Sequence, residues 1–128
     1  MTEVHCKYYP DSKSGSDTSG IKAKGTLHWV SIQHGIPAEI RLYDRLFNDE
    51  APNGHKDRDY MEFLNPDSFK VIKNACLEPS LKNAKAGDQV QFMRLGYFCV
   101  DPDTTDGNLV FNRTVTLKDS WKKRESNP

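Results

Sequence analysis

Hydrophobic and polar residues alternate along several short segments of this chain, with the period of two that is typical of β-strands. The clearest alternation lies in residues 21–29, 38–47 and 109–117, and residues 4–9 and 69–77 predict two further strands. One apolar face of each alternating segment is expected to point to a common core. Its members are Ile21, Ala23, Leu27, Trp29, Ala38, Ile40, Leu42, Leu46, Leu109, Phe111, Val115 and Leu117.

The stretch 87–101 is the longest run that is dense in β-branched, aromatic and aliphatic residues. It begins at a glycine and ends before Pro102. We predict one long strand bent at Gly96, because a residue without Cβ accepts the backbone angles of a β-bulge. Such a strand would hold Gln91 and Arg94 on a rigid element.

Turn and helix signals separate these segments. Residues 10–20 and 48–59 are polar, contain Gly or Pro, and are predicted to be loops. Residues 60–64 predict a single helical turn, and residues 79–86 a short helix or turn. Asp106-Gly107 is a hairpin turn signal. Short alternating strands with polar turns and one or two short helices indicate an all-β domain, either a barrel or a sandwich.

Charge leaves two interpretations open. The chain has 128 residues, of which 18 are basic and 18 acidic, so its net charge is zero. A sequence-independent nucleic-acid binder usually has a basic excess, which this chain lacks. Its acidic residues gather in the predicted loops, whereas basic residues gather on predicted strands and near the C-terminus. This distribution fits a basic face on a neutral protein, and it also fits ordinary solvated strand faces.

Three features predict a cytoplasmic protein. No apolar run approaches the ~20 residues that span a bilayer, and no secretory signal opens the chain. Cys6, Cys76 and Cys99 are far apart and odd in number, which argues against a disulfide framework and for a reducing compartment.

Candidate catalytic chemistry is absent from the sequence pattern. The four histidines have no metal-ligand spacing, and no cysteine pair has zinc spacing. No glycine-rich phosphate loop or Gly-x-Ser-x-Gly nucleophile turn occurs. We therefore expect no catalytic site, metal or cofactor in this chain.

Five blocks of sequence, however, occur in a specific order. They are residues 25–31, 39–47, 77–82 and 91–98, and residues 110–115 followed by Asp119-Ser120-Trp121. Together they resemble the C-terminal anticodon-binding β-barrel region of glutaminyl-tRNA synthetase, in the class I glutamyl/glutaminyl-tRNA synthetase family. The resemblance extends from about Val4 to Lys122. It implies the β-barrel fold of that region and binding of the anticodon loop of tRNA(Gln).

The resemblance also implies site residues. In the family, the residues that match Gln91 and Arg94 lie at the pocket for the middle anticodon base, a uracil. An amide can offer both a donor and an acceptor to a uracil edge, and a guanidinium can bond or stack on a base. The family commonly has glutamate where this chain has Met93. Weaker candidates for contact with the anticodon loop or its backbone are Arg113, Ser120 and Lys122-Lys123-Arg124.

The family's catalytic core contains an ATP-binding αβ unit whose signatures are absent from this sequence. The chain is therefore expected to be part of an anticodon-binding domain (residues 1–128), without the upstream strands and the catalytic domain that binds ATP and Mg in the parent enzyme. Its expected partners are the anticodon loop and that catalytic domain. Unpaired sheet edges would favour self-association, and residues 122–128 are expected to be a frayed tail.

Two alternatives remain open. The same β-barrel domain occurs in glutamyl-tRNA synthetases of the related type. A protein-interaction barrel that binds no RNA is also compatible with the residues, with Tyr43, Phe47 and Tyr97 as an aromatic anchor patch.

Overall fold

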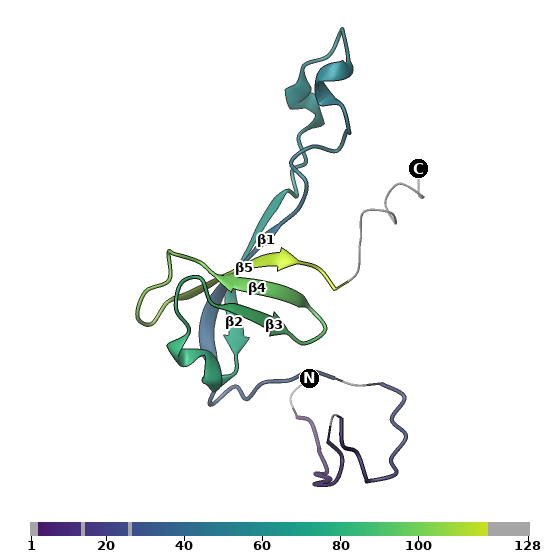
Figure 1. The fold of residues 1–128 in the computed structure, drawn as a ribbon, viewed down its shortest axis with the longest axis vertical. Helices are drawn as coiled ribbons and strands as arrows, with labels where there is room; N and C mark the ends of the chain where they lie inside the picture. Colours follow the sequence, from purple (N-terminus) through teal and green to yellow (C-terminus); the bar gives the residue numbers. More distant parts are fainter. Residues whose placement is uncertain (1–2, 14, 26, 118–128) are drawn as a thin grey trace.

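The computed structural model describes residues 3–13, 15–25 and 27–117. One five-stranded sheet with the strand order β2-β1-β5-β4-β3 forms the body (Figure 1). Strands β1 and β5 pair parallel, and the other neighbours pair antiparallel. The strands are β1 (Ile36–Tyr43), β2 (Phe69–Leu77), β3 (Gln89–Phe92), β4 (Gly96–Val100) and β5 (Leu109–Val115), with 3-10 helices η1 (Pro52–Gly54), η2 (Tyr60–Phe63) and η3 (Pro79–Asn83). The predicted all-β class is confirmed, with three short helices instead of one or two.

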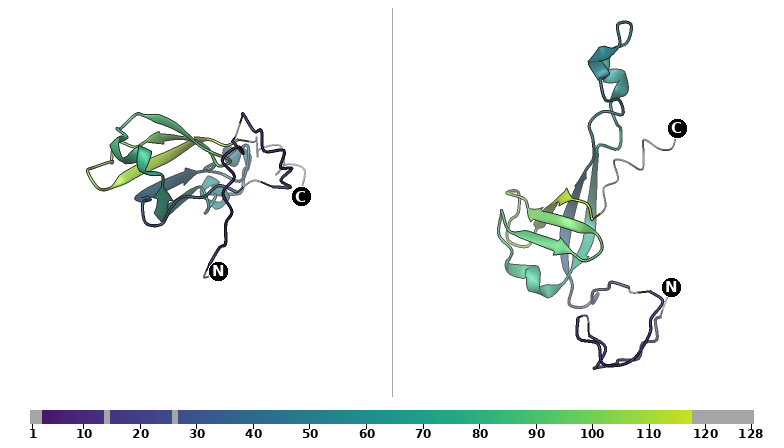
Figure 2. Two further views of the ribbon diagram at one scale, coloured as in Figure 1. Left: turned by 90° about the horizontal axis from the view of Figure 1, so that it is seen from below. Right: turned by 45° about the vertical axis from the view of Figure 1, so that its right-hand side comes forward.

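The sheet curls around a single core (Figure 2). The core takes buried residues from four strands and half-buried residues from β3, so the two edges of the sheet share one apolar cluster. Its buried members are Ala38, Ile40, Leu77, Phe98, Val100, Leu109 and Phe111. The predicted closed barrel is wrong, however, because β2 and β3 are the two edges of the sheet and do not pair. Closure requires hydrogen bonds between the first and last strands, and here Leu81 and Ala84 pack against the core instead.

Strand prediction from alternation succeeds where the segment has a partner. β2 covers the predicted residues 69–77, and β1 and β5 lie within the predicted segments apart from two residues at the start of β1. Within the segments 38–47 and 109–117, three residues predicted to face the core are exposed, namely Leu46, Val115 and Leu117. They lie beyond or at the last residue of a strand, where no second layer covers them.

The N-terminal part of the chain differs most from the prediction. The described residues of segments 4–9 and 21–29 form no strand, and the side chains of Leu27 and Trp29 are 90% and 80% exposed. Alternation predicts a strand only when a neighbouring strand satisfies its backbone and a core covers its apolar face. Neither is available to this segment within the described residues.

The stretch 87–101 is a β-hairpin and not one bent strand. β3 pairs with β4 from Gln89 opposite Cys99 to Phe92 opposite Gly96. The Leu95 N–H donates to the Phe92 carbonyl at 2.9 Å and closes the turn. Gly96 has φ of 146°, and a Cβ placed on it would lie 2.6 Å from the Val115 carbonyl oxygen. The glycine thus permits close approach of β5 at the end of a hairpin. The predicted irregularity is also present, because the register between β4 and β5 shifts between Tyr97 and Phe98, directly after Gly96.

A projecting arm formed by residues 44–68 joins β1 to β2 (Figure 1). Phe47 and Leu64 form an isolated bridge across it, and the Phe47 ring packs against Tyr60 with centroids 6.2 Å apart. The Asp59 side chain accepts from the Met61 N–H and starts η2 with a capping box. The helical turn predicted at residues 60–64 is therefore present.

A polar network fixes the loop between β4 and β5. The buried Asp101 carboxylate accepts from the Asp103 N–H at 2.8 Å and from the Asn112 side-chain amide. Arg41 Nη1 lies 3.3 Å from Asp101 Oδ2 and 2.7 Å from Asp103 Oδ2. These hydrogen bonds, and then the Arg41 charge, hold the pKa of Asp101 below its usual value.

This network predicts an acid-sensitive part of the stability. A carboxyl group with a lowered pKa in the folded state stabilises the fold above its unfolded pKa of about 3.9, and this contribution is lost as pH falls through the folded pKa. Replacing Asp101 by asparagine is expected to lower the free energy of unfolding at pH 7 by roughly 1–3 kcal/mol. It should also make that free energy fall less steeply below pH 4. Urea unfolding from pH 2 to pH 7 tests this, and parallel acid limbs for the two proteins would contradict it.

Candidate nucleic-acid interface

The β3–β4 hairpin carries the predicted site residues Gln91, Met93 and Arg94. Gln91 is exposed and stands opposite Tyr97, while its neighbours Val90 and Phe92 pack on the core. Arg94 lies in the turn with φ of 66°, a left-handed conformation that is unfavourable for residues with a Cβ. The expectation that Arg94 sits on a rigid strand is therefore wrong. Gln91 is fixed by strand pairing, and Arg94 projects from the tip.

A cavity of about 640 Å³ opens beside Gln91. The N-terminal segment, the end of β2 with the start of η3, and the hairpin contribute its lining. The lining residues are His28, Trp29, Val30, Cys76, Leu77, Glu78, Leu81, Val90, Gln91, Phe92, Met93 and Leu95. An amide, an indole and aliphatic walls together suit a flat ring with polar edges, since such rings stack on aromatic side chains and are read by hydrogen bonds at their edges.

Arg113 reaches the same end of the sheet from β5. It stands opposite Phe98, and a Cβ on Gly96 would lie 3.5 Å from its Cδ atom. The fold therefore brings Arg113 against the closing end of the hairpin that carries Gln91 and Arg94. The remaining candidates, Ser120 and Lys122-Lys123-Arg124, lie outside the described residues.

Sequence reasoning missed His28, Trp29 and Glu78 as residues of this cavity. The sequence predicts that Trp29 faces the core from a strand, but its indole is largely exposed and lines the cavity. These residues are separated from Gln91 by tens of positions or by a helix, and no spacing in the sequence indicates that they meet. Their proximity depends on how η3 and the N-terminal segment pass the edges of the sheet.

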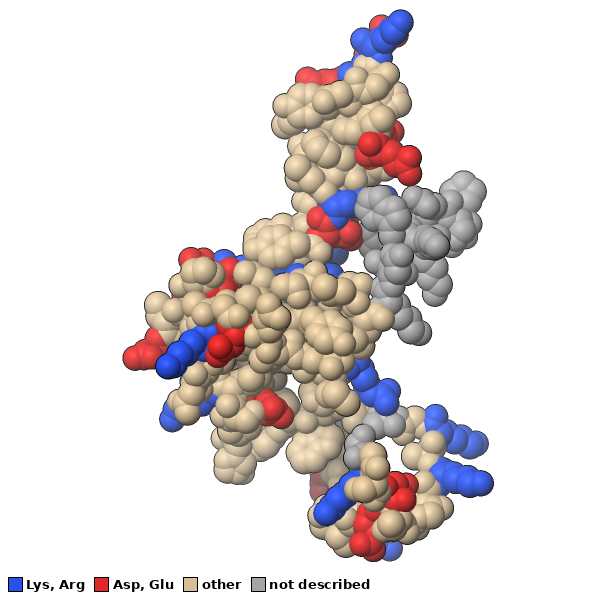
Figure 3. Space-filling model, viewed as in Figure 1, with Lys and Arg blue, Asp and Glu red and all other residues tan. Residues whose placement is uncertain are grey.

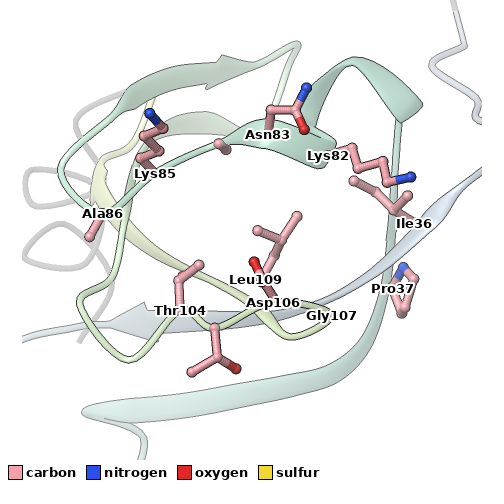
Figure 4. A pocket seen from close by; sticks show the side chains of 12 residues that line it. Ile36, Pro37, Lys82, Asn83, Lys85, Ala86, Thr104, Asp106, Gly107 and Leu109 are labelled. Atoms are coloured by element: carbon pink, nitrogen blue, oxygen red, sulfur yellow. The ribbon is translucent and has the colours of Figure 1, made fainter.

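The charge pattern on the surface is mixed. In the view of Figure 3, basic and acidic side chains alternate over the body and the arm. A second cavity, of about 550 Å³, lies between η3 and the β4–β5 loop (Figure 4). Lys82 and Lys85 line it from the side of η3, and Asp106 and the apolar Leu109 line it from the opposite side. The face shown in Figure 3 is therefore not uniformly basic.

The described residues contain no group of three or more His, Cys, Asp or Glu side chains arranged to hold a metal ion. None of the helices in the described part of the chain has the length and apolar character to cross a membrane.

The aromatic patch of the alternative interpretation is divided in the fold. Tyr43 lies on β1 and stacks on Phe69, with ring centroids 5.0 Å apart. Phe47 is half-buried in the arm, and Tyr97 lies on β4, beyond β5 in the sheet order. The three rings thus lie on three different elements, β1, the arm and β4.

Comparison with known proteins gives a consistent result. A family model described as "tRNA synthetases class I (E and Q), anti-codon binding domain" matches residues 26–101, more than half of the chain. Glutamine–tRNA ligase of Rhodopirellula baltica is 52% identical over 127 residues, which is 98% of this chain and 21% of the relative. The ligase of Ralstonia pickettii is 50% identical over 96% of the chain and 21% of the relative, and that of Proteus mirabilis is 48% identical over 96% and 22%. The chain spans about a fifth of the length of these relatives.

Proposed function

Because the chain belongs to the family of anticodon-binding domains of class I glutamyl- and glutaminyl-tRNA synthetases, we propose that its β3–β4 hairpin reads the middle base of the tRNA(Gln) anticodon. The observation that carries this proposal is the position of Gln91, which is fixed by strand pairing at the edge of a base-sized cavity. Its amide donates to and accepts from a uracil edge, and the Trp29 indole offers a stacking face. The printed name of the relatives, glutamine–tRNA ligase, supports assigning tRNA(Gln) and not tRNA(Glu) as the RNA in this proposal.

Met93 makes this cavity more apolar than the glutamate implied by the family resemblance would. A thioether neither accepts a strong hydrogen bond nor orients a guanidinium. Arg94 is consequently expected to contact RNA without help from its neighbour, through a phosphate or a base face.

The backbone of Arg94 supports a role for its side chain in binding. A non-glycine residue in the left-handed region costs about 1 kcal/mol or more, and glycine would remove that cost at φ of 66°. Arg94→Gly is therefore expected to keep or slightly raise the free energy of unfolding, while the affinity for an anticodon stem-loop falls roughly tenfold, the scale of one charge-assisted hydrogen bond. Urea unfolding and RNA titration of the same protein test both effects. Unchanged RNA affinity in a stably folded Arg94→Gly protein would exclude Arg94 from the interface.

The parent enzyme, in this proposal, attaches glutamine to tRNA(Gln) in the cytoplasm. Its ATP, Mg and catalytic residues belong to the part that lies outside this chain, and the anticodon-binding domain helps select the tRNA. Contact with the catalytic domain then couples anticodon recognition to the distant reaction.

The exposed apolar residues of the N-terminal segment fit a contact surface within the parent enzyme. Leu27, Trp29 and Ile32 are 90%, 80% and 94% exposed, so three large apolar side chains of one short segment are left uncovered within the described residues. The isolated chain is therefore expected to self-associate at micromolar concentrations, through this segment and the open edges of β2 and β3. The double substitution Leu27→Ser and Ile32→Ser should shift sedimentation velocity profiles toward the monomer. Leu46→Ser on the arm is the matched control, and equal shifts in both proteins would count against the N-terminal surface.

Two alternatives predict different behaviour. A glutamyl-specific domain would bind tRNA(Glu) stem-loops at least as well as those of tRNA(Gln). A protein-interaction domain would bind neither, and its partner affinity would depend only weakly on salt, because aromatic interfaces release few counterions.

A further inference from the structure

A third cavity lies where the arm leaves the body, and we call it the neck pocket. It has a volume of about 500 Å³. Its lining comes from the end of β1, the two ends of the arm where it joins β1 and β2, the start of β2, and β5. Its charged lining residues are Asp44, Arg45, Asp67, Lys70 and Arg113.

Hydrogen bonds fix the shape of the neck pocket. Asn65 is 7% exposed, its side-chain amide donates to the Arg45 carbonyl at 2.9 Å, and its side-chain oxygen accepts from the Asp67 N–H at 3.1 Å. Across the two bases of the arm, the Asp44 N–H donates to the Ser68 carbonyl at 2.8 Å. The backbone that carries Arg45 and Lys70 is thus preorganised, which lowers the entropic cost of binding a ligand there.

Arg113 is the most informative group in the neck pocket. It is half-buried, and it forms no ion pair with any residue in the described ranges. A partly desolvated guanidinium is unfavourable unless an anion or several acceptors satisfy it. Lys70 pairs with Asp67 at 2.9 Å, but both side chains are more than half exposed, so the pair is labile. Three cations against two carboxylates leave the pocket with a net positive charge.

The neck pocket also adjoins the proposed base-reading hairpin. The Arg113 stem packs beside Gly96, and Gly96 stands opposite Phe92, the residue after Gln91. Arg113 thus lies beside the closing end of the hairpin that carries Gln91, which is the side from which an RNA strand bound at Gln91 can extend toward the neck pocket. Arginine forms forked bonds with phosphate oxygens that lysine cannot reproduce.

We propose that the neck pocket binds a backbone phosphate of the RNA strand whose base is read at Gln91, with Arg113 as the principal phosphate ligand. Arg45 and Lys70 add to the positive field. This inference rests on the proposed function, because it assigns the second contact of the same RNA. Phosphate contacts fix register and orientation and carry no sequence information, so the pocket contributes affinity and not base preference.

The test is a titration of the intact chain with two fluorescein-labelled anticodon stem-loops, one with a central uracil and one with a central adenine, over a series of salt concentrations. Arg113→Gln is expected to weaken binding of both RNAs by a similar factor, about five- to tenfold at low salt. It should also reduce the slope of log affinity against log salt by about 0.7–0.9. The ratio of the two affinities should not change. Arg113→Lys should retain the salt slope, and Lys85→Gln, which removes a lysine from the separate cavity of Figure 4, should change neither quantity.

Three results would overturn the inference. In the first, the wild-type chain prefers the uracil RNA, and Arg113→Gln changes affinity and salt slope no more than Lys85→Gln does. That result would exclude the neck pocket and leave the proposed function intact. Equal weakening in Arg113→Gln and Arg113→Lys, with an unchanged salt slope, would assign Arg113 to packing. Failure of the wild-type chain to bind either RNA would overturn the proposed function and the neck pocket together.

Discussion

Replacing Gln91 by alanine is expected to abolish most of the preference of this chain for a central uracil over a central adenine. A well-placed pair of base-edge hydrogen bonds contributes about 1–3 kcal/mol to discrimination, which corresponds to roughly 5- to 150-fold in the ratio of dissociation constants. The residue that provides these bonds is held by the pairing of β3 with β4 and lies at the rim of the cavity lined by Trp29 and Met93. Titration of Gln91→Ala with both stem-loops measures the ratio.

Gln89→Ala provides a matched control. Gln89 is the same residue type, is exposed, and lies two positions earlier on the same face of β3, but it does not line the cavity of Gln91. It should retain the wild-type ratio of affinities. Equal loss of preference in the two variants would show that the hairpin acts through its stability and not through one amide.

Replacing Gly96 by alanine is expected to give the largest loss of stability among single methyl additions in the hairpin. At φ of 146° an L-residue is strained, and the new Cβ would lie 2.6 Å from the Val115 carbonyl oxygen. Backbone strain and overpacking each cost about 1–3 kcal/mol, so the free energy of unfolding should fall by roughly 2–5 kcal/mol. Relief of this contact moves β4 and its hairpin away from β5, which carries Arg113, so affinity for RNA should also fall. Urea unfolding measures the first effect.

Gly107→Ala separates backbone conformation from close approach. Gly107 also has a positive φ, 84°, but open space surrounds the position of its missing Cβ. Its replacement should cost only about 1 kcal/mol, the cost of the backbone conformation. If the two alanine variants lose equal stability, then the contact between Gly96 and Val115 does not constrain the hairpin.

The sequence pattern correctly predicted the strands and turns that are determined by a few consecutive residues. The alternation around Ile40 and Phe111 predicts β1 and β5 because both segments have paired neighbours and a core-facing side. The turn signal Asp106-Gly107 lies in the β4–β5 loop as expected, with Gly107 at positive φ. These features depend on a few consecutive residues.

The misjudged parts depend on contacts between distant segments. The alternation in residues 21–29 does not show whether a neighbouring strand is available to pair with them. Likewise, no local pattern shows whether the two edges of a curved sheet pair with each other. Gly96 ends the hairpin and directly precedes a register shift between β4 and β5, and its close approach to Val115 follows from the pairing of distant strands. For the site, the residue types at Gln91 and Arg94 pointed to base recognition, but the cavity with Trp29 and the placement of Arg113 required the fold.

The most direct measurement is the affinity of the unmodified chain for the two anticodon stem-loops, with central uracil and with central adenine, at two salt concentrations. We predict tighter binding of the uracil RNA by at least tenfold, and weaker binding of both RNAs at the higher salt concentration, because base contacts specify the sequence and phosphate contacts release counterions. Equal affinities for the two RNAs would contradict base reading by the hairpin. Absence of binding to either RNA, in a chain shown to be folded, would contradict its function as an RNA-reading domain.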